Sequence, residues 1–196
     1  LMDRHSSITR ETNETRIKLS LTLAAGPVSV TTGLPFMDHM LTACGRHGRL
    51  GLVVDAEGDL EIDAHHTIED LGLVLGRALR EALGDKKGVE RFGFSTIPMD
   101  EALARAVVDL SGRPCLAYRV ASPSCDCGGF NTRLFREFFQ AFVNTGGVTL
   151  HLDLLAGEEV HHCFEALFKA FGRALGQAVR LDPCCIDVPS TKGVLE

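Results

Sequence analysis

The sequence predicts an α+β protein made by internal duplication, in which each half is a small sheet with helices on one side. The main observation is a repeat: HHTIEDLGLVLGRAL at 65–79 and HHCFEALFKAFGRAL at 161–175 share 8 of 15 residues at an offset of 96. Alternating strand-like runs and stretches of helical spacing also recur in the same order around both copies. We therefore predict a first half at 1–94 and a second half at 95–196.

The first half contains short alternating runs before each stretch of helical spacing. Gly26-Pro27 favours a turn, and it predicts that the two runs around it pair as a hairpin. The predicted elements are strands 16–23 and 27–32, a helix over 36–44, strands 50–56 and 60–63, and a helix that Asp63 caps and Gly84 ends.

The second half repeats this order with a longer insertion. Residues 122–132 are rich in Ser, Cys and Gly, which predicts a mobile loop. The predicted elements are a bend at 95–100, strands 104–110 and 116–121 joined by a turn at 111–114, a helix over 134–143, a strand over 148–155, a helix over 160–180 and a polar tail from Asp182.

Composition excludes several classes of protein. The 196 residues are 45% hydrophobic and 23% charged, with a formal net charge of −6 and no basic run, so nucleic acid and anionic membranes are not expected partners. No apolar stretch is long enough to cross a bilayer, and no secretory signal opens the sequence. The seven cysteines are odd in number and do not follow a disulfide or zinc-ribbon spacing. A cytoplasmic location is expected.

The repeated motif HHxxE has the geometry of a metal-binding helix. Positions i and i+4 share a helix face, so His65 lies over Glu69, and His161 over Glu165. The adjacent histidines point about 100° apart, so one helix can offer imidazoles to two different ions. Imidazole and carboxylate without thiolate suit Mn, Fe, Co or Zn. One such pair is often only polar surface, but two copies at matched places in a repeat favour metal binding.

Five further polar residues predict an anion site, because guanidinium, ammonium and hydroxyl groups bind phosphate monoesters. They lie outside the predicted core and are Arg91, Arg113, Lys169, Ser190 and Lys192. Lys169 is the most informative, since the first copy of the repeat has Leu73 at that position. Taken singly, each of these residues is more often a solvated surface group than a phosphate ligand.

Several motifs together resemble the imidazoleglycerol-phosphate dehydratase family of histidine biosynthesis, and the resemblance runs from about residue 9 to residue 195. The motifs are FMDHML (36–41), DAHHTIED (63–70), RFG (91–93), PMDEA (98–102), DLSGRP (109–114), HHCFEALFKA (161–170) and STKG (190–193). The resemblance implies a duplicated fold of the ribosomal-S5-domain-2 type. It also implies a shell of trimers, a 24-mer in the family, with sites where subunits meet and two Mn²⁺ ions per site.

The resemblance also implies roles for particular residues. The implied metal ligands are His39, His65, His66, Glu69, His161, His162 and Glu165. Glu137 pairs with His39 in the repeat and stands where the family usually has histidine; we expect it to ligate, and the open alternative is one ligand fewer. Glu11 is the implied acid/base, Glu11 and the five anion-site residues contact the substrate, and the tail supplies phosphate contacts.

The implied reaction is a hydro-lyase step, the dehydration of D-erythro-imidazole glycerol phosphate to imidazole acetol phosphate. Two metals flanking the imidazole would favour an imidazolate that expels the neighbouring hydroxyl, which makes His65, Glu69, His161 and Glu165 catalytic together with Glu11. Two alternatives stay open from the residues alone: a dinuclear metallohydrolase acting on a phosphorylated small molecule, and a non-catalytic shell assembled by metal.

Overall fold

The structure is a computed structural model that describes residues 4–185 and 187–195. The ends of the predicted halves at 1–3 and 196, and residue 186, lie outside this description. The first half contains β1 (His5–Glu11), β2 (Thr15–Thr22), β3 (Val28–Thr31), α1 (Pro35–Gly48), β4 (Gly51–Gly58) and α2 (His65–Leu83). The second half contains β5 (Phe92–Met99), β6 (Ala102–Asp109), β7 (Cys115–Arg119), β8 (Asp126–Cys127), β9 (Phe130–Asn131), α3 (Leu134–Gly146), β10 (Thr149–Ala156) and α4 (Val160–Ala178).

The two halves have the same topology. One sheet has the order β1-β2-β4-β3 and the other β5-β6-β10-β7. In each sheet the first three strands of that order are antiparallel, while the last strand runs parallel to its neighbour. The parallel pair follows from the helix between its strands, because a crossover returns the chain in the same direction. This repetition confirms the predicted α+β fold of two similar sheet-and-helix halves.

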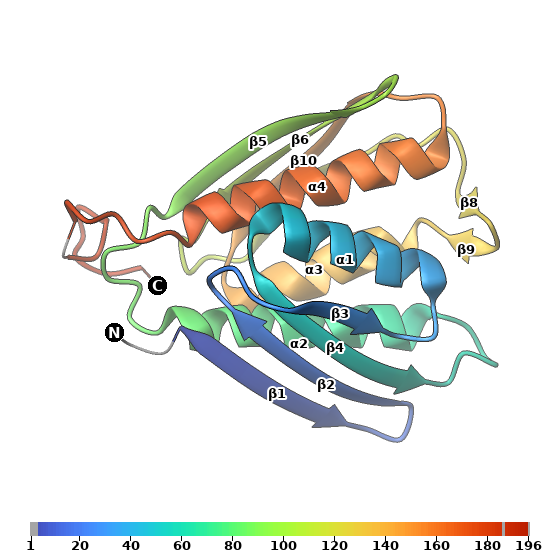
Figure 1. The fold of residues 1–196 in the computed structure, drawn as a ribbon, viewed down its shortest axis with the longest axis horizontal. Coiled ribbons are helices and arrows are strands. Elements are labelled where there is room, and N and C mark those ends of the chain that lie inside the picture. The colour runs from blue at the N-terminus through green and yellow to red at the C-terminus, as the bar shows by residue number, and fades with distance from the viewer. Residues whose placement is uncertain (1–3, 186, 196) are drawn as a thin grey trace.

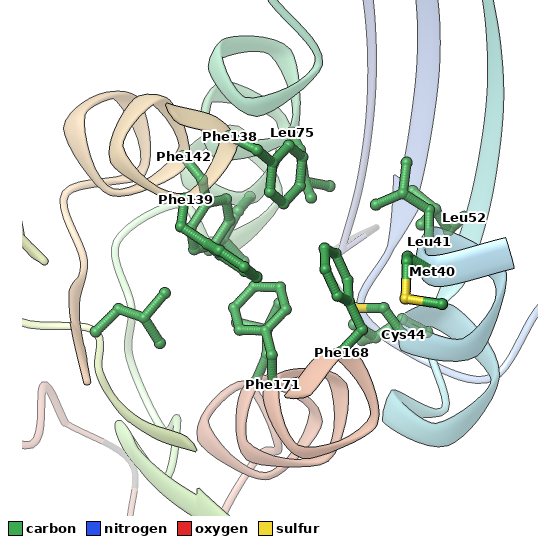
Figure 2. Packing of buried hydrophobic residues seen from close by; sticks show 14 of the residues in the cluster. Met40, Leu41, Cys44, Leu52, Leu75, Phe138, Phe139, Phe142, Phe168 and Phe171 are labelled. Carbon is green, nitrogen blue, oxygen red and sulfur yellow. The ribbon is translucent and has the colours of Figure 1, made fainter. Parts of the chain in front are cut away.

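All four helices lie between the two sheets (Figure 1). α2 packs on α3 and α1 packs on α4, so each HHxxE helix contacts the first helix of the other half. Figure 2 shows how phenylalanines fill this middle layer: Phe168 and Phe171 of α4 point toward Phe139 of α3, and Phe168 also faces Met40 of α1. These side chains are fully buried, so the packed helices hold the two halves together.

Glycines allow two of these helix pairs to approach closely. A Cβ on Gly172 of α4 would collide with the backbone of Cys44 in α1, and one on Gly76 of α2 with the backbone of Phe142 in α3. Gly76 and Gly172 are equivalent positions of the repeat, 96 residues apart. The same contact between halves is therefore made twice.

Three predicted local features are wrong. Strands β2 and β3 do not form a hairpin, because β4 lies between them. The predicted turn at 111–114 does connect β6 and β7, although β10 lies between these two strands in the sheet. Residues 60–62 form a turn instead of a strand. The predicted bend at 95–100 is most of β5, an edge strand that tolerates Pro98.

The other predicted elements are present, with a small β8-β9 ribbon inside the predicted 122–132 loop. The boundary at 94/95 remains a prediction about the duplication, and it lies inside β5. A division in the linker 84–91 would keep each sheet whole. Among the described residues, no helix has both the length and the apolar character that crossing a bilayer requires.

Candidate metal centre

The second HHxxE copy forms a compact group with a histidine from the first half. The Nε2 atoms of His39 and His161 lie 3.1 and 3.0 Å from the same Glu165 oxygen, Oε2. One potential ligand atom from each residue falls within 4.8 Å of the other two, and in the described part of the chain no other three such residues come so close. Three donors thus converge from α1 and α4, and the sequence separates His39 from Glu165 by 126 residues.

Glu165 is held in its charged form. Its other oxygen, Oε1, lies 2.5 Å from the Lys169 ammonium one helical turn away, and both side chains are mostly buried. Burial by itself would raise the pKa of the Glu165 carboxyl, but the bonds from Lys169 and the two imidazoles lower it to about 2. A carboxylate that is already ionised and oriented does not have to lose a proton before it binds a cation.

The first HHxxE copy is more open. His65 Nε2 lies 3.9 Å from Glu69 Oε2, and both side chains are nearly half exposed. Glu137 of α3 takes the place that His39 has in the other half, and its nearest charged partner is Arg136 at 3.8 Å. α2 contacts α3 as α4 contacts α1, but among the described residues His65, Glu69 and Glu137 do not come as close together as His39, His161 and Glu165.

The second histidine of each pair is fixed by a carboxylate. Asp59 Oδ2 lies 2.9 Å from His66 Nδ1, and Glu101 Oε2 lies 2.8 Å from His162 Nδ1. Each bond raises the pKa of its imidazole, and the His162 bond lowers the pKa of Glu101 to about 2. A carboxylate on Nδ1 leaves Nε2 as the atom that can bind a metal.

Sequence reasoning missed both of these carboxylates. Asp59 follows β4, and Glu101 lies in the tight β5–β6 turn, where Asp100 has a positive φ of 47°. Glu101 also accepts bonds from the backbone N–H groups of Glu158 and Glu159. The repeat could not reveal them, because Asp59 and Glu101 play the same part in the two halves but do not occupy equivalent positions of the repeat.

A pocket of about 940 Å³ adjoins the group. His39, His65 and His161 line it together with Phe36, and the β8–β9 ribbon contributes Cys127. Cys127, like the other six cysteines, is a free thiol. The pocket is large enough for a small metabolite and presents imidazoles from both HHxxE helices.

The residues predicted to bind phosphate fall into two places. Arg91, Arg113, Ser190 and Lys192 line one small pocket of about 360 Å³, whereas Lys169 lies beside Glu165. Arg91 forms a bidentate pair with Asp109, at 2.8 and 3.2 Å, and donates to the Pro189 carbonyl oxygen. One subunit therefore does not bring all five residues together.

The distance between these two places follows from α4. The backbone N–H of Arg91 donates to the carbonyl oxygen of Ala178 at the end of α4, nine residues beyond Lys169. At a rise of about 1.5 Å per residue, that separation is about 14 Å along the helix. The Lys169 side chain does not shorten it, because its ammonium lies at Glu165, one helical turn farther from Arg91.

Glu11 ends β1 and is exposed. Its neighbour Arg10 pairs with Asp70 of α2 at 2.9 Å, and the following turn places Glu14 within 3.8 Å of His66. Glu11 thus lies near the start of α2, at the same end of the subunit as the first HHxxE copy.

The donor set fits a metal ion of the borderline or hard class. Two imidazole nitrogens and one carboxylate oxygen converge without a thiolate, and the carboxylate is ionised. Three protein donors leave coordination positions for other ligands. The arrangement can therefore hold a cation at the edge of a pocket that has room for a substrate.

Comparison with known proteins gives a consistent result. A sequence model described as imidazoleglycerol-phosphate dehydratase matches residues 32–175. Curated proteins of that name from Geobacter metallireducens and Acidiphilium cryptum are 54% and 56% identical to the chain, over 99% of it and 100% of their own length. The crystal structure of the Staphylococcus aureus protein of that name has a TM-score of 0.83 at 41% identity, and covers 91% of this chain and 99% of its own. The Pyrococcus furiosus structure has a TM-score of 0.84 at 37% identity, covering 96% and 100%.

Proposed function

Because the chain belongs to the imidazoleglycerol-phosphate dehydratase family, we propose that its two HHxxE helices hold the metal ions on which this family depends. The chain is a hydro-lyase of histidine biosynthesis, which dehydrates imidazole glycerol phosphate to imidazole acetol phosphate. This assignment favours dehydration over the metallohydrolase and the non-catalytic shell.

The observation that carries the metal proposal is the convergence of two imidazole nitrogens on one oxygen of Glu165. We assign the ligands His39, His161 and Glu165 to one group and His65, Glu69 and Glu137 to the other. His66 and His162 point away from these groups by the helix geometry, so they serve ions shared with a neighbouring subunit. The proposed cofactor is Mn²⁺, two ions per active site, since this ion accepts both imidazole and carboxylate.

When bound, the ions supply Lewis-acid stabilisation of negative charge on the substrate's imidazole ring. The protein's own residues do the remaining work. The HHxxE imidazoles and carboxylates orient the ring in the pocket, and Asp59 and Glu101 keep the Nε2 atoms of His66 and His162 in place. Glu11 moves the carbon-bound proton as general acid/base.

Arg91, Arg113, Ser190, Lys192 and Lys169 bind the substrate's phosphate. The separation of about 14 Å along α4 within one subunit and the direction of the Lys169 side chain toward Glu165 support a phosphate site to which Lys169 and the other four residues come from different subunits. We therefore propose that the active site is assembled between subunits, in a shell of trimers with 24 copies. Such an enzyme would act in the cytoplasm.

Metal-loaded protein incubated with imidazole glycerol phosphate tests the reaction through the product's enol absorbance in base. We expect turnover that a chelator abolishes. Released phosphate would indicate a hydrolase instead, and many loosely held ions without turnover would indicate storage.

The role of Glu11 has its own test. Glu11→Gln should fold and bind metal as the unchanged protein does, yet turn over about 10²–10⁴-fold more slowly, the usual contribution of general acid–base catalysis. Unchanged turnover would remove Glu11 from proton transfer.

A further inference from the structure

A second pocket, of about 600 Å³, lies at the carboxyl-terminal ends of α1 and α4. Five cationic or titratable side chains from separate segments line it: Arg4, His47, Arg49, Arg173 and Arg180. None of the described residues lining it is acidic, although the chain as a whole carries −6. This local excess of positive charge needs an explanation.

Two of the arginines already have partners within the protein. Arg4 donates to the carbonyl oxygen of Val179 at 2.6 Å, and Arg180 pairs with Glu90 at 3.1 Å. Arg49 and Arg173 are exposed and have no ion pair with any residue in 4–185 or 187–195. Burial, followed by the nearby Lys169 and Arg173, lowers the pKa of His47, which agrees with a positive field here.

Comparison of the two halves shows why Arg173 has no carboxylate partner on its own helix. Its counterpart in the first half, Arg77, pairs with Glu81 one helical turn later at 3.0 Å. The position of Glu81 is taken in the second half by Gln177, whose oxygen accepts a bond from the backbone N–H of Phe94. The second half has thus lost the counter-charge and kept the guanidinium.

Phe94 adds a flat apolar surface to the same pocket. Its side chain is 70% exposed and lies at the pocket wall. Planar bases stack on exposed aromatic rings, and guanidinium groups bind phosphates through paired N–H donors. We propose that this pocket is a nucleotide site, which holds the phosphates of a nucleoside triphosphate on Arg49 and Arg173 and its base on Phe94. This site is separate from the metal centre and does not depend on the dehydratase mechanism.

Titration calorimetry on the assembled, metal-loaded protein tests the proposal, with MgATP as the probe. The double variant Arg49→Gln/Arg173→Gln should bind MgATP at least about tenfold more weakly, since two charge-assisted contacts are lost. Arg77→Gln is the matched control, because it removes the equivalent arginine of the first half, and it should bind as the unchanged protein does. Equal affinity of the double variant and the unchanged protein would overturn the site.

Two further measurements sharpen the test. Magnesium tripolyphosphate should bind more weakly than MgATP, and Phe94→Ser should remove that difference; equal affinity of the two probes would overturn the nucleotide assignment. The mass of the assembly is measured for the double variant. A changed mass would show that the arginines face another subunit, and this would also overturn the proposal.

Discussion

The two HHxxE helices have the same motif and the same topology but are not equally organised. On α4, Glu165 is 11% exposed in its side chain and is bonded by His39, His161 and Lys169. On α2, Glu69 is 49% exposed and lies 3.9 Å from His65. The equivalent of Lys169 on α2 is Leu73, so Glu69 has no lysine one helical turn after it. Both halves therefore keep the HHxxE motif, but only the second has a preorganised carboxylate.

The largest expected effect distinguishes the two glutamates by stability. Both Glu165→Gln and Glu69→Gln should reduce turnover at least about a hundredfold, because removing even an outer partner of a metal ligand costs about 10–100-fold. Only Glu165→Gln should also destabilise the metal-free protein, by about 3 kcal/mol, because it leaves the mostly buried Lys169 ammonium without its partner.

Urea unfolding of the metal-free variants measures that difference. Glu69→Gln should stay within about 0.5 kcal/mol of the unchanged protein, because its carboxylate is half exposed. Equal losses in the two variants would contradict the asymmetry.

Lys169→Leu makes the second copy like the first. We expect it to raise KM for the substrate about tenfold or more with the metal content retained, because the ammonium is proposed to bind phosphate. Metal analysis and steady-state kinetics check this, with Leu73→Lys as the reciprocal variant. An unchanged KM would remove Lys169 from the phosphate site.

The carboxylates that hold the second histidines should matter less. Asp59→Ala and Glu101→Ala are each expected to weaken Mn²⁺ binding by about 10–100-fold. The effect of Asp59→Ala should be the larger, because Asp59 is 12% exposed and Glu101 36%. Competitive titration with a chelator measures both, and Glu57→Ala is the control, because Glu57 is exposed and pairs with Arg16 instead of a histidine.

The smallest effect concerns the outer face of the second sheet. Burial alone would raise the pKa of Asp153, but Arg119 and Arg105 lower it below its usual value. A lowered carboxyl pKa adds stability above the unfolded value of about 3.9, and that stability is lost as pH falls through the folded pKa. Asp153→Asn should thus be less stable than the unchanged protein at pH 6, with the difference closing below about pH 4.

Acid titrations of thermal unfolding check this difference. Asp55, which matches Asp153 in the repeat, is exposed, and Asp55→Asn serves as control. A gap that persisted at pH 2 would mean that packing, and not charge, explains the Asp153 effect.

The spacing of apolar residues predicted the helices correctly, but it did not predict which strands lie next to each other in the sheets. The apolar spacing around His39, and that after His65 and His161, belongs to α1, α2 and α4, because helical periodicity is a property of one segment. The placement of β4 between β2 and β3 depends on contacts between distant segments, about which a period of two says nothing.

The site shows the same limit. The repeat predicted which residues could bind metal, and the structure brings His39 to Glu165 across 126 residues. Nothing local to either residue could show that α1 meets α4. Nor could the sequence show that Arg91 is held by Asp109, or that it lies at the carboxyl-terminal end of α4, away from Lys169.

The exchange of helix partners between the halves has an evolutionary consequence. The group of His39, His161 and Glu165 takes α1 from one half and α4 from the other, and the glycine contacts between halves are made twice. A single unfused ancestor of half this length could have built such a group only as a homodimer, with each copy lending its helix to its twin. After gene fusion the two equivalent sites of the symmetric dimer could mutate independently. The difference between Lys169 and Leu73 is one result of this divergence.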